Sequence, residues 1–298
     1  MKRPIIGMGH SMGASQAVAV ATYHPRIFEV LVLIDPAMTM TAGETIPAMI
    51  KYALSKPETF KSYEAAEKNV HKHPFFKRWH PAAKQKYIET AFHIEPTTLY
   101  PERDGTLKPK TSVFAETRGI TRPNLQHAHA AKPPTTLQRY SIPDVDTSSP
   151  YTGPGYNPFS RQAYAWLGQL RPATQFILGK GSKVNPVSEL EGRTNFTGSR
   201  VGGSGGVKAG NVKSVTISGG HFLPMTNPEQ TAEEAASWMA ERIEKWRSAE
   251  KQFSRSFDQR DRAEKQALEP EVAKTFKNWD GKLWNNPHAE PDGGKSRL

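Results

Sequence analysis

The first part of the chain alternates short apolar runs with a stretch of small residues. An apolar segment covers residues 4–8, small residues cover 14–21, and a nearly continuous β-branched and leucine run covers 28–34. Short apolar runs bounded by turn residues are typical of strands buried on both faces of a parallel sheet. The chain is therefore predicted to open as strand, helix and strand, with Asp35 at the end of the second strand.

Two further strands are predicted in the second half of the chain. Residues 174–179 form an apolar run, and residues 212–217 alternate apolar and polar positions before Gly219-Gly220-His221. A helix is signalled directly afterwards, because Asn at an N-cap followed by Pro at the first helical position is a helix start. Its apolar stripe at helical spacing extends to Trp246, beyond which the pattern turns strongly polar.

Residues 38–165 differ from the predicted core in composition and hydrophobic pattern. Helix-like stretches occur around 45–72 and 81–94, whereas 96–160 is rich in Pro, Thr, Ser and Gly. An insertion of this length after a core strand predicts a lid or cap, although for 120–158 a poorly ordered surface loop explains the composition equally well. The predicted organisation is a core over 1–37, a lid or cap over 38–165, the rest of the core over 166–247, and a polar helical extension and tail over 248–298.

Composition narrows the chemistry further. The 298 residues include no cysteine, which excludes thiol nucleophiles, disulfides and cysteine-ligated zinc. No His, Asp and Glu cluster has metal-ligand spacing, and no apolar run approaches membrane-spanning length. The net charge of +11 comes largely from residues 51–110 and 161–220. A solvated basic surface or attraction of an anionic substrate explains this charge better than nucleic-acid binding, because no basic helix or aromatic-basic ladder accompanies it.

The pentapeptide Gly9-His10-Ser11-Met12-Gly13 lies between the first predicted strand and helix. G-x-S-x-G in a strand–turn–helix context is the pattern of a nucleophile elbow, which holds the serine in a strained turn at the carboxyl end of a strand. Gly9 and Gly13 are expected to let strand and helix pack closely. The backbone N–H of Met12 is expected to donate to a developing oxyanion. His10 is expected to support the site from a position pointing away from Ser11.

A serine nucleophile needs a base and an acid that orients the base. His221 follows the last predicted strand, which is where an α/β-hydrolase carries its histidine. The acid commonly follows the strand two after the elbow, yet residues 179–183 contain no carboxylate. Asp35, at the end of the strand immediately after the elbow, is therefore the predicted acid. The predicted catalytic residues are Ser11, Asp35 and His221 in an α/β-hydrolase fold, a parallel sheet flanked by helices, with no cofactor and no metal.

Four segments of the chain together resemble the fungal α/β-hydrolases of toxin and secondary-metabolite biosynthesis. These segments are GHSMG, LVLIDPAM, VGGSGGVKAG and SGGHFLPM. That group includes hydrolases of AK-toxin biosynthesis and peroxisomal acyl-CoA hydrolases of the mycophenolic-acid type. The resemblance covers residues 1 to about 246 and implies an acid after the strand that follows the elbow, which Asp35 matches. It also implies hydrolysis of an ester or a thioester such as an acyl-CoA.

The C-terminal tripeptide Ser296-Arg297-Leu298 is a close variant of the Ser-Lys-Leu peroxisomal address. It predicts recognition by the peroxisomal import receptor and a peroxisomal location, with the cytoplasm as the alternative. The predicted partners are thus a small-molecule ester or thioester and this receptor, without nucleic acid or a membrane span. The oligomeric state is left open by the sequence.

The sequence starts at the predicted elbow strand, whereas an α/β-hydrolase normally has further strands before it, one loop of which supplies a second oxyanion donor. We therefore expect the sequence to be a fragment or a degenerate hydrolase, with the elbow strand at an exposed sheet edge. Loss of one oxyanion donor costs on the order of 100–1000-fold in rate. The alternative to an active hydrolase is a catalytically inactive remnant that acts as an interaction or regulatory protein.

Overall fold

The computed structural model describes residues 3–38, 45–102, 104–120, 158–185 and 187–281. The chain divides into two units, residues 1–246 and 247–298. The first unit holds the sheet and all the predicted catalytic residues. In the described part of the second unit, helix α11 (Pro228–Asp258) ends and α12 (Pro270–Lys277) follows. No helix among the described residues combines the length and the apolar character needed to cross a membrane.

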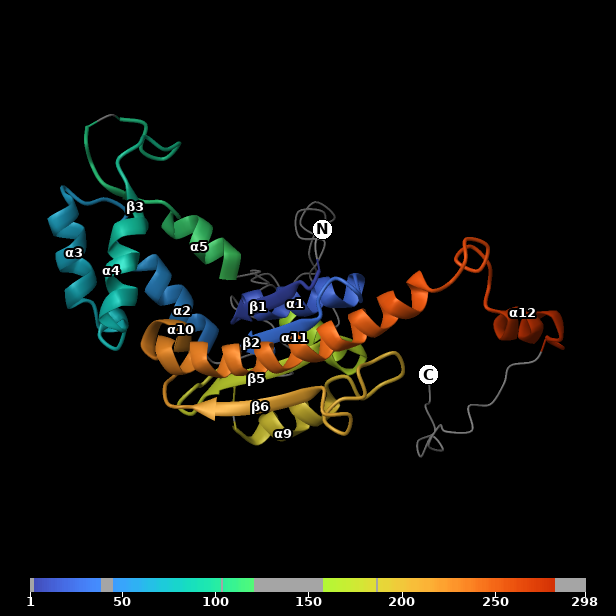
Figure 1. The fold of residues 1–298 in the computed structure, drawn as a ribbon. Helices are drawn as coiled ribbons and strands as arrows, with labels where there is room; N and C mark the ends of the chain where they lie inside the picture. Colours follow the sequence, from blue (N-terminus) through green and yellow to red (C-terminus); the bar gives the residue numbers. More distant parts are fainter. Residues whose placement is uncertain (1–2, 39–44, 103, 121–157, 186, 282–298) are drawn as a thin grey trace, which may run out of the picture. The chain divides into compact units, whose positions relative to one another are not determined.

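The first unit is built on a four-stranded parallel sheet in the order β1-β2-β5-β6 (Figure 1). The strands are β1 (Ile6–His10), β2 (Val30–Ile34), β5 (Ala173–Gly179) and β6 (Val212–Ile217). In register, His10 pairs with Ile34, which pairs in turn with Ile177. Because all four strands run the same way, their carboxyl ends meet at one edge, where open parallel sheets place ligand sites. The predicted parallel sheet is therefore confirmed.

Both faces of the sheet are covered by helices, as the unbroken apolar run of β2 requires. Leu31 and Leu33 point to the face packed by α1 (Met12–Tyr23), α8 (Pro158–Trp166), the short helix η2 (Leu167–Gln169) and α9 (Val187–Phe196). The alternate residues of β2 contact the opposite face, where α10 (Leu223–Thr226) and the first part of α11 pack. Every residue of β2 is buried, so this strand forms the centre of the core.

Helix α8 belongs to the core rather than to the insertion. Ala163 and Leu167 are fully buried in the same cluster as Ala14 and Val18 of α1. The predicted boundary between insertion and core at residue 165 therefore lies too late in the chain, because α8 already packs on the sheet. Its helical pattern was hidden in sequence by the Pro- and Gly-rich stretch that precedes it, most of which lies outside the described residues.

At one edge of the sheet, β1 pairs with β2, and the described residues supply no second neighbour for it. The side chain of Met8 in this strand is 51% exposed.

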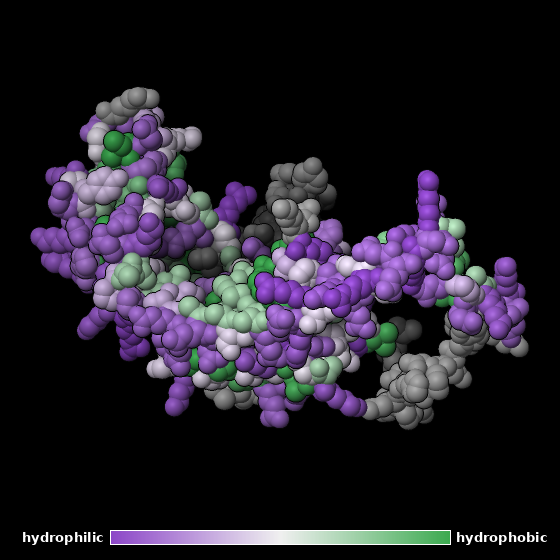
Figure 2. Space-filling view, in the orientation of Figure 1, coloured by the Kyte–Doolittle hydropathy of each residue, from purple (hydrophilic) through white to green (hydrophobic). Residues whose placement is uncertain are grey.

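The predicted cap, called the cap below, has its own hydrophobic cluster in its described residues. Its elements are α2 (Thr45–Leu54), α3 (Tyr63–Lys72), the short helix η1 (Pro74–Phe76), α4 (Pro81–Thr90), β3 (Phe92–His93), β4 (Lys108–Pro109) and α5 (Val113–Ile120). The cap's apolar side chains, among them Phe76, Ile88 and Phe92, pack against one another. The visible surface over α3 and α4 is mostly hydrophilic, as expected when the apolar residues face inward (Figure 2).

The cap contacts the core at the segment that follows the last strand. The backbone N–H of His80 donates to the Met225 carbonyl at 2.7 Å. The Phe75 ring meets the Phe222 ring edge-on, with centroids 4.9 Å apart. Since Phe222 directly follows His221, the cap touches the loop that carries the predicted catalytic histidine.

Candidate active site

Ser11 occupies a strained turn between β1 and α1. Its φ is +54° and its ψ −121°, a conformation that residues with a side chain rarely adopt. The turn is held from both sides, because the Ser11 N–H donates to the Ile34 carbonyl at 3.0 Å and the Ser11 carbonyl accepts from Ala37 N–H at 3.0 Å. These bonds fix the side chain at the carboxyl edge of the sheet, which is the geometry of a nucleophile elbow.

The two glycines of the motif differ in what they do. A Cβ added to Gly9 would lie 2.5 Å from the Ala14 nitrogen and from backbone atoms of Gly13, so glycine is required for strand and helix to approach. A Cβ added to Gly13 would meet no described atom within 4 Å. The prediction that Gly13 is needed for close packing was therefore wrong, because the close approach involves its backbone and not the space beside its Cα.

Replacing Gly9 by alanine is expected to destabilise the protein by about 1–3 kcal/mol, since the added methyl group collides with backbone that cannot move aside. Gly13→Ala is the matched control. It is expected to leave stability unchanged or to raise it by up to about 1 kcal/mol, because alanine favours the helix. Urea unfolding followed by circular dichroism measures both. Equal stability of the two variants would contradict the packing role assigned to Gly9.

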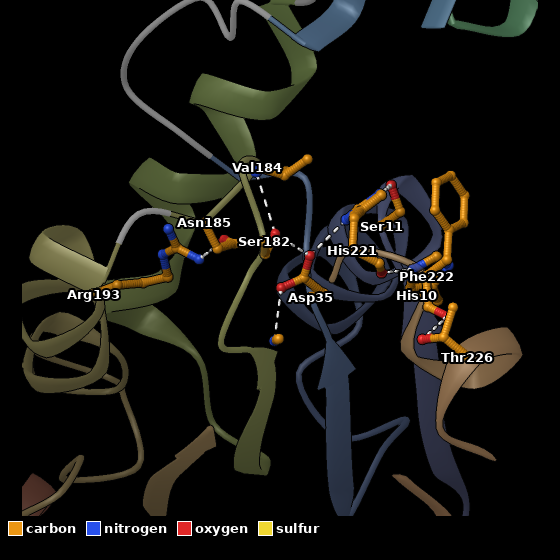
Figure 3. Close-up of polar contacts among 11 residues, drawn as sticks. His10, Ser11, Asp35, Ser182, Val184, Asn185, Arg193, His221, Phe222 and Thr226 are labelled. Carbon is orange, nitrogen blue, oxygen red and sulfur yellow. Dashed lines mark hydrogen bonds and ion pairs between the residues drawn. The ribbon is translucent and has the colours of Figure 1, made fainter. Parts of the chain in front are cut away.

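Three side chains far apart in the sequence form one hydrogen-bonded chain at the carboxyl edge of the sheet (Figure 3). His221 Nε2 lies 2.9 Å from Ser11 Oγ, and His221 Nδ1 lies 2.6 Å from Asp35 Oδ2. Asp35 is fully buried, and the His221 side chain is 10% exposed. This is the arrangement of a nucleophile, a base within hydrogen-bond reach, and an acid that orients the base.

The buried carboxylate of Asp35 is held by more than the histidine. Ser182 Oγ donates to Asp35 Oδ2 at 2.6 Å, and the Gly179 N–H donates to Oδ1 at 3.3 Å. The backbone of Asp35 has a φ of +39°, and its N–H donates to the Ile177 carbonyl at 2.8 Å. The Asp35 carboxylate thus has three hydrogen-bond partners, His221, Ser182 and Gly179, which fix its orientation toward His221.

Ser182 was not identified from the sequence. It lies in the loop after β5, the segment that was set aside because it contains no carboxylate. The Val184 N–H donates to Ser182 Oγ at 3.2 Å, which directs the serine's own proton to Asp35. The one sequence signal that could have identified Ser182 was its position as a polar residue just beyond a core strand. That strand ends at the same edge of the sheet as the strand before Asp35.

The same loop is anchored from behind by a buried arginine. Arg193 in α9 is fully buried and donates a hydrogen bond from its guanidinium to the side chain of Asn185 (Figure 3). Burial lowers the pKa of Arg193 from its usual value. Because Asn185 lies three positions after Ser182, this contact fixes the end of the loop that carries the hydroxyl group.

His10 lies against the backbone of the catalytic loop. Its Nε2 is 2.7 Å from the His221 carbonyl oxygen, which can only accept, so Nε2 carries the proton. The His10 ring also lies 4.9 Å from the His221 ring between centroids. Burial lowers the pKa of His10, which keeps the ring uncharged at neutral pH. The structure thus places His10 as a support for His221 rather than beside the Ser11 hydroxyl.

Two predicted site features remain, Met12 and the C-terminal tripeptide, besides the glycine-rich loop on which the family resemblance partly rests. Met12 is the first residue of α1, so its N–H has no partner within the helix. The glycine-rich loop over 201–206 packs beside η2, where Ser204 N–H donates to the Leu170 carbonyl, and it precedes β6 rather than following it. This loop therefore lies away from the carboxyl edge of the sheet. Ser296, Arg297 and Leu298 lie outside the described residues.

Comparison with known proteins places the fold. No protein-family model matches the chain. It is 29% identical over 273 residues, 85% of its own length, to the type I acyl-CoA thioesterase mpaH of Penicillium roqueforti. It is 24% identical over 244 residues to the abhydrolase domain-containing protein ACTT2-1 of Alternaria alternata, of which it covers 84%. The chain is thus a homologue of these fungal proteins, and it spans 62% of the length of the Penicillium relative.

A solved structure agrees with this result. The peroxisomal α/β-hydrolase Lpx1 of Saccharomyces cerevisiae superposes with a TM-score of 0.54 at 17% identity, over 89% of this chain and 63% of that one. At this level of identity the likeness shows the fold alone. The chain has an α/β-hydrolase fold, as predicted from its motifs.

Proposed function

We propose that this protein is a serine hydrolase that cleaves a carboxylic ester or thioester through Ser11, His221 and Asp35. The observation that carries the proposal is the continuous hydrogen-bonded chain from Ser11 Oγ through the His221 ring to the buried Asp35 carboxylate. A serine in a strained elbow, a histidine on its hydroxyl and an acid behind the histidine are the parts that acyl transfer needs.

In the proposed reaction, Ser11 Oγ attacks the acyl carbonyl carbon while His221 Nε2 takes the serine proton. The Met12 N–H at the start of α1 donates to the oxyanion that forms, and Asp35 stabilises the charged imidazolium. His221 then passes the proton to the leaving thiolate or alkoxide as the bond from carbon to sulfur or oxygen breaks. Water attacks the acyl-serine in turn, its proton going to His221 and back to Ser11 as the acid is released.

The substrate class that we favour is an acyl-CoA thioester. The Penicillium relatives carry the name acyl-CoA thioesterase, and the basic excess of the chain would suit the phosphates of CoA. We also propose a place in fungal secondary metabolism. The peroxisome is the proposed location because Ser296-Arg297-Leu298 fits a peroxisomal address.

A fluorophosphonate probe tests the proposal directly, because it phosphonylates only a serine that a base activates. We expect one adduct per chain, mapped to Ser11 by peptide mass spectrometry. Ser11→Ala is expected to abolish the adduct without changing the unfolding curve, while Ser199→Ala on the surface keeps it. A folded protein that is not labelled at Ser11 would favour the inactive remnant over the hydrolase.

The preference for CoA has its own test. We expect a higher kcat/KM for an acyl-CoA than for the same acyl group on pantetheine, which lacks the nucleotide phosphates. The difference should shrink as salt is added, because screening weakens attraction between the basic protein and an anionic substrate. Equal rates on both thioesters at low salt would contradict the CoA assignment while leaving the hydrolase proposal standing.

Ser182 is the positioning residue that we expect to matter most. Ser182→Ala removes a hydrogen bond to a buried carboxylate, and we expect kcat to fall about tenfold to a hundredfold with KM unchanged. Ser182→Thr, which keeps the hydroxyl group, is expected to restore most of the rate. Steady-state kinetics on one thioester measure both variants. A fall in thermal stability without a change in kcat would mean that Ser182 is only structural.

A further inference from the structure

Arg193 is the largest fully buried side chain among the described residues. It lies in α9, which packs on the same face of the sheet as α1, and it takes no direct part in the proposed reaction. An arginine stays protonated in a protein, so its burial places a positive charge inside the core. Removing such a charge from water is costly, and it is expected only where ion pairs and hydrogen bonds compensate for it.

The pairing of the Arg193 guanidinium is incomplete. Glu189, one turn earlier in α9, lies 3.7 Å away, which is too long for a hydrogen bond, and its side chain is 32% exposed. Nη1 donates to the Asn185 side chain, whereas Nε and Nη2 have no hydrogen-bond partner among the described residues. A buried ion pair is often no better for stability than apolar side chains of similar size. The stability of the fold by itself therefore does not account for an arginine at this position.

The position of Arg193 behind the acid of the triad offers another explanation. In Figure 3, Arg193 and Asn185 lie on the opposite side of Asp35 from His221. Asn185 ends the loop that carries Ser182, whose hydroxyl group donates to Asp35 Oδ2 at 2.6 Å. Burial lowers the pKa of Arg193, and the Asp35 carboxylate is one of the groups that counter this shift. The buried charge thus lies within electrostatic reach of the acid as well as holding its loop.

We propose that Arg193 is a positioning residue for the acid of the triad, which it holds toward the histidine by anchoring the loop of Ser182. Two of the three hydrogen bonds to the Asp35 carboxylate come from this loop and the strand residue before it, Ser182 and Gly179. A loop that shifts weakens both bonds, and the carboxylate then loses its fixed orientation. Functional sites are where folds keep locally unfavourable residues, and the inference rests on the proposed hydrolase function.

A double variant tests the proposal. Arg193→Met combined with Asn185→Leu replaces both partners of the contact by apolar side chains of similar size, so that neither partner is left unpaired. We expect it to unfold at the same or a higher temperature than the parent protein, as measured by circular dichroism. The rate at which fluorophosphonate labels Ser11 is expected to fall about fivefold to twentyfold, within the range of coupling inside one hydrogen-bonded network.

Two variants serve as controls. Arg242→Met removes another buried arginine, which binds the Gly210 carbonyl and the Asn211 side chain at the amino end of β6. It is expected to lower the unfolding temperature and to leave the labelling rate unchanged. Asn185→Asp keeps an oxygen acceptor for Arg193 and is expected to be labelled at nearly the parent rate. Labelling of the double variant at the parent rate would overturn the proposal.

A spectroscopic readout separates positioning of the acid from a general loss of structure. His221 Nδ1 lies 2.6 Å from Asp35 Oδ2, so the proton between them is expected to give a low-field proton resonance that is absent from His221→Gln. We expect this resonance to move upfield or to broaden in the double variant and to stay in Arg242→Met. Slower labelling with an unchanged resonance, or a parent protein without the resonance, would count against the proposal.

The route through Ser182 has its own test. When the double variant is combined with Ser182→Ala, labelling is expected to slow by less than about twofold more, because groups in one network are not additive. Losses that multiply would overturn the route through the loop.

The resonance also keeps this proposal distinct from the proposed function, because it needs no turnover. A parent protein that is not labelled at Ser11 contradicts the hydrolase proposal. In that case a resonance that changes in the double variant still supports the role of Arg193 in holding Asp35, and a resonance that does not change overturns it.

Discussion

Replacing His221 by glutamine is expected to lower the rate of Ser11 acylation on the order of 10⁶-fold, because removing one member of a serine–histidine pair costs nearly as much as removing both. His221 Nε2 is 2.9 Å from Ser11 Oγ and is the base that takes its proton. Glutamine can accept a hydrogen bond there but cannot carry the proton away. Single-turnover acylation with a p-nitrophenyl ester or a fluorophosphonate measures the loss.

The control for this variant is His71→Gln, a change at an exposed histidine of the cap. We expect it to acylate at the parent rate. The unfolding curve of His221→Gln should stay close to that of the parent. The substitution keeps the His221 backbone carbonyl, to which His10 donates a hydrogen bond. Acylation of His221→Gln within tenfold of the parent rate would show that another group acts as the base.

Replacing Asp35 by asparagine is expected to lower the acylation rate about 10⁴-fold, the scale found when a triad acid becomes an amide. The carboxylate accepts hydrogen bonds from His221, Ser182 and Gly179. An amide turns one acceptor into a donor, so a proton faces another proton and the imidazole loses its orientation. Stopped-flow acylation at saturating ester measures the effect, with Asp104→Asn in the cap as the control.

A double-mutant cycle makes this prediction sharper. If Ser182 acts through the carboxylate, then Ser182→Ala should cost little more once Asp35 is already asparagine. Groups that share a hydrogen-bond network are not additive. Two independent losses whose effects multiply would show that Ser182 influences the rate by another route.

Local patterns in the sequence were sufficient to predict the strands of the core sheet and the turn at Ser11. The four strands were predicted from apolar runs and alternation, and the sheet has them in parallel, because burial on one or both faces imposes those patterns on each strand by itself. The elbow was predicted because a strained turn at Ser11 needs particular neighbours within a few residues. The fold followed from these signals. The catalytic roles of Ser11, Asp35 and His221 stay predictions, although the structure brings the three side chains together.

Other features depend on residues that meet only after folding. Ser182 reaches Asp35 across 147 positions, and nothing near it in the sequence marks it as a partner of a buried carboxylate. Two other features also depend on which residues lie nearby after folding. They are the packing of α8 in the core and the empty space beside the Gly13 Cα. Hydrophobic pattern determines which face of an element is buried, but the geometry of packing decides what that face meets.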